Sequence, residues 1–182
     1  MKNKKIVCLG DSLTQGYQIN EANRWTNLLQ NEFAANIINC GISGDTTNGM
    51  LARCETVLLQ YKPTHIIILG GTNDLWFGLK NEYILSNIHA MIRQASNYNA
   101  IPVVGIPTTI LNNKERNFVK ENYLERITNF QDMLEAYCLV DNQKTIPFYK
   151  NMNASHFLED GLHPNEAGQI IIKNNVLSFF LN

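Results

Sequence analysis

Two short apolar runs, each followed by glycine, constrain the fold of this chain more than any other feature. Residues 6–9 (Ile-Val-Cys-Leu) precede Gly10, and residues 65–69 (His-Ile-Ile-Ile-Leu) precede Gly70 and Gly71. Continuous runs of this length, rich in Ile and Val, are typical of strands that are covered on both faces, as in a parallel sheet. Since parallel strands need long crossover connections, usually helices, we expect helices between these runs.

The rest of the chain alternates between helical periodicity and further short apolar runs. Helices are predicted over residues 22–33, from an N-cap at Asp45 or Thr46 to about residue 60, over 81–96 and over 117–137, and a last one has Pro164 as its first residue. Further strands are predicted over 36–40, over 101–106, and over either 138–140 or 145–148. This order predicts one α/β domain over residues 1–182, with a five-stranded parallel sheet between two helical layers.

Composition and charge exclude several classes of partner. Fifteen basic and sixteen acidic residues give a net charge of −1, which provides no field to recruit nucleic acid or an anionic membrane. No run approaches the roughly 20 apolar residues that span a bilayer. The first apolar run ends at Leu9, too early for a signal peptide, so we expect a cytoplasmic protein. The four cysteines show no paired spacing, and we expect free thiols rather than a metal site.

Polar turns follow three of the predicted strands. If the strand order is the flavodoxin-like 2-1-3-4-5, strands 1 and 3 are neighbours at the switch point where ligands bind in such sheets. Ser12, Gly44 and Asn73 then surround one crevice. The N–H groups of Ser12 and Gly44 and the side-chain amide of Asn73 can donate to a single oxygen there. Fixed donors of this kind stabilise the oxyanion that forms in acyl transfer.

A serine becomes a nucleophile only when a base accepts its proton. Residues 160–164 (Asp-Gly-Leu-His-Pro) place Asp160 and His163 three positions apart in a turn, where they can hydrogen-bond each other. Asp160 would fix the tautomer of His163, whose other ring nitrogen would face Ser12. His156 is the nearest rival base, but no carboxylate is paired with it in the sequence.

Two more carboxylates lie within these turns. We expect Asp11 to accept hydrogen bonds from neighbouring turn amides and so to support the site, and Asp74 to be structural.

Four blocks carry a family resemblance: residues 10–13 (Gly-Asp-Ser-Leu), 41–45 (Gly-Ile-Ser-Gly-Asp), 70–74 (Gly-Gly-Thr-Asn-Asp) and 160–164. In this order they resemble the four sequence blocks of the GDSL (SGNH) hydrolases, and the chain looks most like the short bacterial members related to thioesterase I, lysophospholipase L1 and arylesterase. The resemblance implies a three-layer flavodoxin-like fold. It also implies Ser12 as nucleophile, His163 as base and Asp160 as its orienter, with Ser12, Gly44 and Asn73 in the oxyanion hole. No metal or organic cofactor is implied.

These residues predict a serine ester hydrolase that cleaves small-molecule acyl esters or thioesters through an acyl-enzyme. The same residues would also serve a carbohydrate O-deacetylase, which is the main rival prediction. Two non-hydrolytic functions are compatible with the same fold: a binding module without catalytic activity, and a flavodoxin-like nucleotide or flavin binder. The acyl-chain length and the oligomeric state are left open.

Apolar side chains that leave the strand ends on the catalytic side form a candidate acyl-binding groove. The candidates are Tyr17, Trp76, Phe77 and Ile110. The competing interpretation is that these side chains only pack the loops against neighbouring helices.

Overall fold

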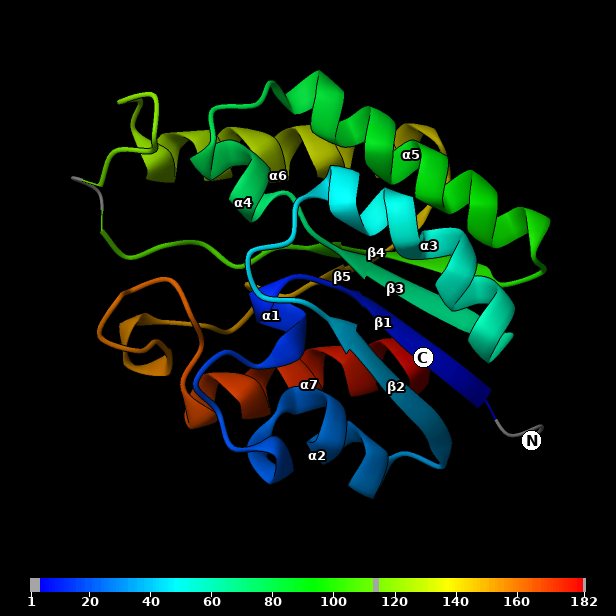
Figure 1. Ribbon diagram of the computed structural model, residues 1–182. Coiled ribbons are helices and arrows are strands. Elements are labelled where there is room, and N and C mark those ends of the chain that lie inside the picture. Colours follow the sequence, from blue (N-terminus) through cyan, green and yellow to red (C-terminus); the bar gives the residue numbers. More distant parts are fainter. Residues whose placement is uncertain (1–3, 113–114, 182) are drawn as a thin grey trace.

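The structure, a computed structural model, describes residues 4–112 and 115–181. At its centre is a five-stranded parallel sheet in the order β2-β1-β3-β4-β5 (Figure 1). The strands are β1 (Lys4–Gly10), β2 (Ala35–Gly41), β3 (His65–Leu69), β4 (Ile101–Ile106) and β5 (Lys144–Pro147). The predicted fold class and strand order are confirmed.

Strand register aligns the carboxyl ends of the three strands that precede the candidate site. Gly10, the last residue of β1, pairs with Gly41 at the end of β2 and with Leu69 at the end of β3. The chain therefore leaves all three strands at the same edge of the sheet. The turns that follow them meet there.

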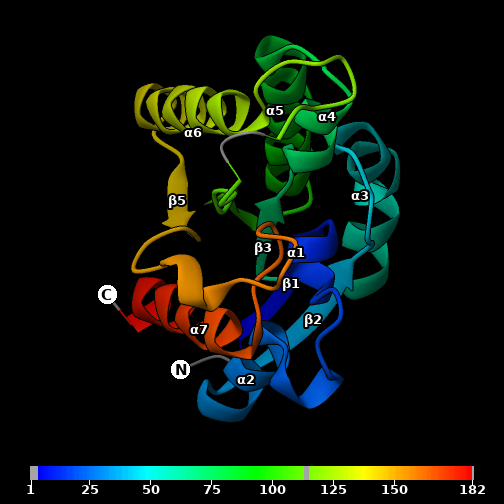
Figure 2. The ribbon, with the colours of Figure 1, turned by 90° about the vertical axis from the view of Figure 1, so that its left-hand side faces the viewer.

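Helices cover both faces of the sheet (Figures 1 and 2). One layer contains α1 (Ser12–Gln15), α2 (Trp25–Glu32) and α7 (Glu166–Leu181), and the other contains α3 (Thr47–Tyr61), α4 (Thr72–Trp76), α5 (Asn81–Asn97) and α6 (Tyr123–Val140). Two short 3-10 turns cover Glu21–Asn23 and Ala154–His156. The side chains of β1 point alternately to the two faces of the sheet and so contribute to both layers of the core. Ile6 and Cys8 pack with α2 and α7, whereas Val7 and Leu9 pack with α3 and α5.

Two predicted helix starts are wrong. Helix α6 begins at Tyr123 instead of residue 117, because the buried Asn117 donates from Nδ2 to the Leu75 carbonyl and accepts at Oδ1 from the Glu121 N–H, which holds a loop. Helix α7 begins at Glu166, so Pro164 lies before it and is not its first residue. The Asn165 side chain accepts from the Gly168 N–H at 3.1 Å and caps this helix.

The fifth strand lies at residues 144–147, close to the second of the two predicted positions. Residues 138–140 belong to α6. In the described part of the chain, no helix has the length and apolar character needed to cross a membrane.

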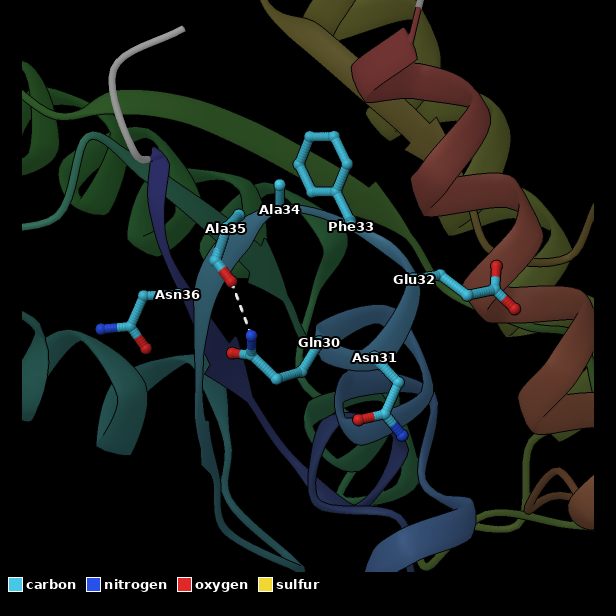
Figure 3. A pocket seen from close by; sticks show the side chains of 7 residues that line it. All are labelled: Gln30, Asn31, Glu32, Phe33, Ala34, Ala35 and Asn36. Carbon is cyan, nitrogen blue, oxygen red and sulfur yellow. Dashed lines mark hydrogen bonds between the residues drawn. The ribbon is translucent and has the colours of Figure 1, made fainter.

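An open hollow lies where α2 ends and β2 begins, lined by residues 30–36 (Figure 3). Gln30 Nε2 donates to the Ala35 carbonyl at 2.7 Å within it. Ala35 is the first residue of β2, and a seven-residue strand is about 20 Å long. This hollow therefore lies at the amino-terminal end of the strands, whereas Ser12 and the polar turns lie at the carboxyl end.

Candidate active site

Ser12 lies in the turn that follows β1, in a segment that is largely buried. A Cβ on Gly10 would lie 2.1 Å from Thr14 Oγ1 and 2.6 Å from the Leu69 carbonyl oxygen, so only glycine lets α1 begin this close to the strand. Asp11 caps α1 by accepting from the Leu13 N–H at 2.9 Å. Ser12, the first residue of this four-residue helix, is 8% exposed.

Ser12, His163 and Asp160 form one chain of hydrogen bonds. Ser12 Oγ lies 3.0 Å from His163 Nε2, and His163 Nδ1 lies 2.7 Å from Asp160 Oδ2. A carboxylate accepts from Nδ1–H, which leaves Nε2 to accept from the serine hydroxyl. A hydroxyl held in this way can pass its proton to the ring as it attacks a carbonyl carbon. The structure thus brings together the three residues that the sequence singled out.

The loop that carries Asp160 and His163 is ordered by its own short-range contacts. Asp160 Oδ1 accepts from the backbone N–H groups of Leu162 and His163, each at 2.9 Å. Burial alone would raise the pKa of Asp160, but the hydrogen bonds from His163 and Leu162 outweigh it and lower the pKa below the usual value. Asp160 therefore remains a carboxylate that can orient the imidazole.

Tyr17 lies against the imidazole of His163. The two ring centroids are 4.3 Å apart, with an interplanar angle of 38°. The sequence predicts that Tyr17 lines an acyl-binding groove. The structure places its ring against the candidate base and leaves 38% of the residue exposed.

The candidate oxyanion donors come from three different turns. Gly44 lies in an exposed loop with φ +80°, a conformation that favours glycine, and Asn73 lies in α4. Within residues 4–112 and 115–181, the N–H groups of Ser12 and Gly44 donate to no acceptor. Asn73 Nδ2 donates to the Asp45 carbonyl at 2.9 Å and lies 3.5 Å from Asp11 Oδ2. An amide nitrogen carries two hydrogens: one is bonded to Asp45 and fixes the amide, and the other makes only the long contact with Asp11, so a stronger acceptor such as an oxyanion can take it.

A buried network joins α4 to the start of α3. Asp74 accepts from the Thr47 N–H at 2.9 Å and from the Thr47 hydroxyl at 2.6 Å. Asn87 Nδ2 donates to the same hydroxyl at 3.0 Å. The network ties the turn that carries Asn73 to the helix that follows Gly44, in keeping with the structural role expected of Asp74.

Burial raises the pKa of Asp11 to about 7; the hydrogen bond from Leu13 opposes this shift, and the charges of Asp74 and Asp45 add to it. Asp11 is fully buried beneath the site. Its contacts with Leu13 and Asn73 fit the supporting role expected of it.

The remaining groove candidates differ in exposure. Phe77 is 50% exposed, while Trp76 is partly buried and meets Tyr123 edge to face. Ile110 is buried in the core between the sheet and α6, so it does not line a surface groove. Phe118, which the sequence assigned to a helix, is 70% exposed and lies 6.4 Å from Phe77 between ring centroids.

His156, the rival base, has a structural role. Its Nδ1 accepts from the Asn153 N–H at 3.0 Å and closes the 3-10 turn at residues 154–156. Across the described ranges, no group of three or more His, Cys, Asp or Glu side chains is arranged to hold a metal ion.

Comparison with known proteins gives consistent matches over nearly the whole chain. The sequence profile of the GDSL-like Lipase/Acylhydrolase family matches residues 8–171. An arylesterase of Vibrio mimicus is 30% identical over 176 residues, which covers 92% of this chain and 83% of the relative. The thioesterase 1/protease 1/lysophospholipase L1 of Escherichia coli K12 is 24% identical, over 92% of this chain and 78% of the relative.

A solved structure shares the same arrangement. A member of the lipolytic protein G-D-S-L family from Veillonella parvula superposes with a TM-score of 0.84 at 25% sequence identity. The superposition covers 98% of both chains.

Proposed function

Because this chain belongs to the GDSL-like lipase/acylhydrolase family, we propose that it is a serine ester hydrolase with Ser12, His163 and Asp160 as its catalytic triad. The observation that carries the proposal is the continuous hydrogen-bonded chain from Ser12 Oγ through the imidazole to Asp160, with distances of 3.0 and 2.7 Å. Both distances lie within the reach needed for proton transfer.

In acylation, Ser12 Oγ attacks the carbonyl carbon of the substrate while His163 Nε2 takes the hydroxyl proton. The Asp160 carboxylate stabilises the imidazolium that forms and keeps the ring in the productive tautomer. The carbonyl oxygen becomes an oxyanion and accepts from the N–H groups of Ser12 and Gly44 and from Asn73 Nδ2. His163 then protonates the departing alcohol or thiol, which leaves the acyl group on Ser12.

In deacylation, water takes the place of the leaving group. His163 removes a proton from the water as its oxygen attacks the acyl carbon, and the same donors hold the second oxyanion. Collapse of this intermediate returns the proton to Ser12 Oγ and releases the carboxylic acid. The cycle needs no redox step, and each proton taken by His163 is given back within the same half-reaction.

Acyl esters or thioesters are the proposed substrates. The exposed rings of Phe77 and Phe118 support this class, because they offer apolar surface at the C-terminal end of the helix that carries Asn73. The names of the relatives from Vibrio and Escherichia, an arylesterase and a thioesterase, agree with it.

Hydrolysis of p-nitrophenyl esters from acetate to palmitate, with palmitoyl-CoA alongside, tests the proposal. We expect activity that rises from acetate to longer chains and disappears in Ser12→Ala. Activity confined to acetate would favour the O-deacetylase, and full activity in Ser12→Ala would refute the triad. Phe77→Ala should lower the preference for longer chains, whereas Tyr83→Ala, a change at an equally exposed ring, should not.

A further inference from the structure

One arginine of α3 connects the segments that carry the candidate oxyanion donors. Arg53 Nε donates to Asp45 Oδ2 at 2.9 Å, Nη1 to the Cys40 carbonyl at 2.7 Å and Nη2 to the Gly10 carbonyl at 2.9 Å. Only 21% of its side chain is exposed, and only 12% of that of Asp45. All three nitrogens of the guanidinium group are thus engaged.

The three acceptors of Arg53 belong to segments next to the candidate site. Gly10 is the last residue of β1, two positions before Ser12, and Cys40 lies at the end of β2. Asp45 directly follows Gly44. Because a guanidinium group is planar, permanently charged and rigid, it fixes the relative positions of the groups that it binds. Arg53 therefore sets where the Gly44 turn lies relative to the end of β1.

Asp45 couples this arrangement to the third donor. Its side chain accepts from Arg53, while its backbone carbonyl accepts from Asn73 Nδ2 at 2.9 Å. A displacement of Asp45 would move the Gly44 N–H and the Asn73 amide together.

Packing does little to hold the Gly44 turn. Residues 42–44 are exposed, and a Cβ built on Gly44 would meet no atom within 4 Å. The turn is held instead by hydrogen bonds. They are the bond of Arg53 to Asp45, the Ile42 N–H to the Gly10 carbonyl at 3.0 Å, the Ser43 N–H to Gln15 Oε1 at 2.7 Å, and the Asp45 N–H to the Ile42 carbonyl at 3.1 Å. Oxyanion donors must be held to within about 0.5 Å to be effective.

We propose that Arg53 is a positioning residue for the oxyanion hole, acting through Asp45 to hold the Gly44 N–H and the Asn73 amide on a common point. The inference rests on the proposed function, since it assigns these donors to the oxyanion. Arg53 itself does not touch the reacting atoms. Its effect is on the transition state rather than on substrate binding, so it should appear in kcat and not in KM.

Kinetics of Arg53 variants on an ester and its thionoester test the assignment. The thiono sulfur is a poor acceptor for donors spaced for oxygen, so a damaged oxyanion hole matters less for the thionoester. We expect Arg53→Met to lower kcat for the ester by about 100-fold, within the range for loss of one such donor, with KM changed less than about threefold. The loss on the thionoester should be below about threefold. Arg53→Lys keeps the positive charge but loses the planar set of N–H donors, so its kcat for the ester should lie between those of the wild type and Arg53→Met.

The control is Lys173→Met, which removes the bonds of a buried ammonium to Glu32 in the opposite helical layer. It should lower the melting temperature and leave kcat unchanged. A kcat for Arg53→Met within threefold of the wild-type value, or equal losses on the ester and the thionoester, would overturn the proposal.

Hydrogen exchange separates this inference from the proposed function. The Ser43 and Asp45 amides should exchange at least about tenfold faster in Arg53→Met than in Lys173→Met at matched global stability. Equal protection in the two variants would show that Arg53 does not hold the turn, whatever reaction the protein catalyses. An absence of ester hydrolysis in the wild-type protein would refute the proposed function and leave the exchange result to be judged by itself.

Discussion

Asp11 and Asp160 flank the site in opposite surroundings. Asp11 is fully buried beneath the oxyanion half, which we define as the proposed donors Ser12, Gly44 and Asn73, and burial raises its pKa to about 7. The side chain of Asp160 is 40% exposed in the base half, formed with His163, and its hydrogen bonds lower its pKa. Burial thus favours the neutral form of Asp11, whereas hydrogen bonds favour the charged form of Asp160, which the proposed triad requires.

The contacts that hold the two halves differ in the same way. The oxyanion half is held by bonds between distant residues: Asn73 to Asp45 spans 28 positions, and Arg53 to Gly10 spans 43. In the base half, Asp160 and His163 are three positions apart and bond within one turn. Changes in the oxyanion half should therefore lower stability as well as kcat, whereas a change at His163 in the base half should act mainly on kcat.

The largest expected effect is in the base half. His163→Ala should lower kcat on p-nitrophenyl esters by at least about 10⁴-fold, since it removes the proposed base of both half-reactions. Only 14% of the His163 side chain is exposed, but the ring belongs to neither hydrophobic core cluster, so the free energy of unfolding should fall by only about 1 kcal/mol. Urea unfolding measured alongside the kinetics checks both statements. A large loss of stability in this variant would contradict the expectation that His163 acts mainly on kcat.

The next effect is the pH dependence of stability set by Asp11. Its folded pKa of about 7 lies above the ordinary value of 3.8, so between these pH values the folded state holds a proton that the unfolded state has lost. Stability should therefore fall as pH rises from about 4 to 7, by up to about 4 kcal/mol for a shift of this size, and then level off. Asp160 acts in the opposite sense: its lowered pKa contributes stability above pH 3.8 that is lost as the pH falls below it.

Urea unfolding of wild type and Asp11→Asn at several pH values between 4.5 and 8 measures the Asp11 contribution. The difference in stability between the two proteins should shift in favour of the variant as pH rises. Parallel stability curves would contradict the account of Asp11.

A smaller effect is expected at Asp74, whose hydrogen bonds support the oxyanion half. Asp74→Asn removes one of two acceptor oxygens and leaves a buried Thr47 donor without a partner, which should cost about 2 kcal/mol in the free energy of unfolding. Asp132→Asn, at an exposed position of α6, is the control and should change it by less than about 0.5 kcal/mol. Equal midpoints of urea unfolding for the two variants would argue against the role of the Asp74 network.

The smallest effect concerns Tyr17, whose ring lies on His163. An aromatic face favours the imidazolium that forms in the transition state by about 0.5–1 kcal/mol at an exposed site. Tyr17→Leu should therefore lower kcat two- to fivefold, while Tyr17→Phe, which keeps the ring, should stay near the wild-type value. Equal kcat values for the leucine and phenylalanine variants would show that the ring face contributes nothing.

The strands of the sheet could be predicted well because each one is a short run of apolar residues that is visible in the local sequence. The Ile-rich run at residues 65–69 matches β3 in full, and residues 101–106 match β4. Helices α1 and α4 were missed because four or five residues are too short to show helical periodicity. The start of α6 was misplaced because the buried side chain of Asn117, which stabilises a loop, has no signature in a helical pattern.

In the candidate site, too, local features could be predicted and contacts between distant residues could not. Ser12, Asp160 and His163 were found because each lies in a short motif, and the structure brings them within hydrogen-bond distance. The contact of Tyr17 with His163 and the bonds of Arg53 were missed, because they join residues that are far apart in the sequence. Ile110 was assigned to the groove because it is apolar and follows the fourth strand at the catalytic end of the sheet, and neither property distinguishes a buried side chain from an exposed one.

In the proposed mechanism, Ser12 is a nucleophile activated by His163. Intact-mass analysis after incubation with a fluorophosphonate tests it most directly, because Ser12 Oγ must lose its proton to His163 as it displaces fluoride from phosphorus. We predict a single adduct on the wild-type protein, mapped to the peptide that contains Ser12, no adduct on Ser12→Ala, and labelling slowed by at least about 10³-fold in His163→Ala. A wild-type protein that stays unlabelled, or an adduct that forms equally on Ser12→Ala, would contradict the claim.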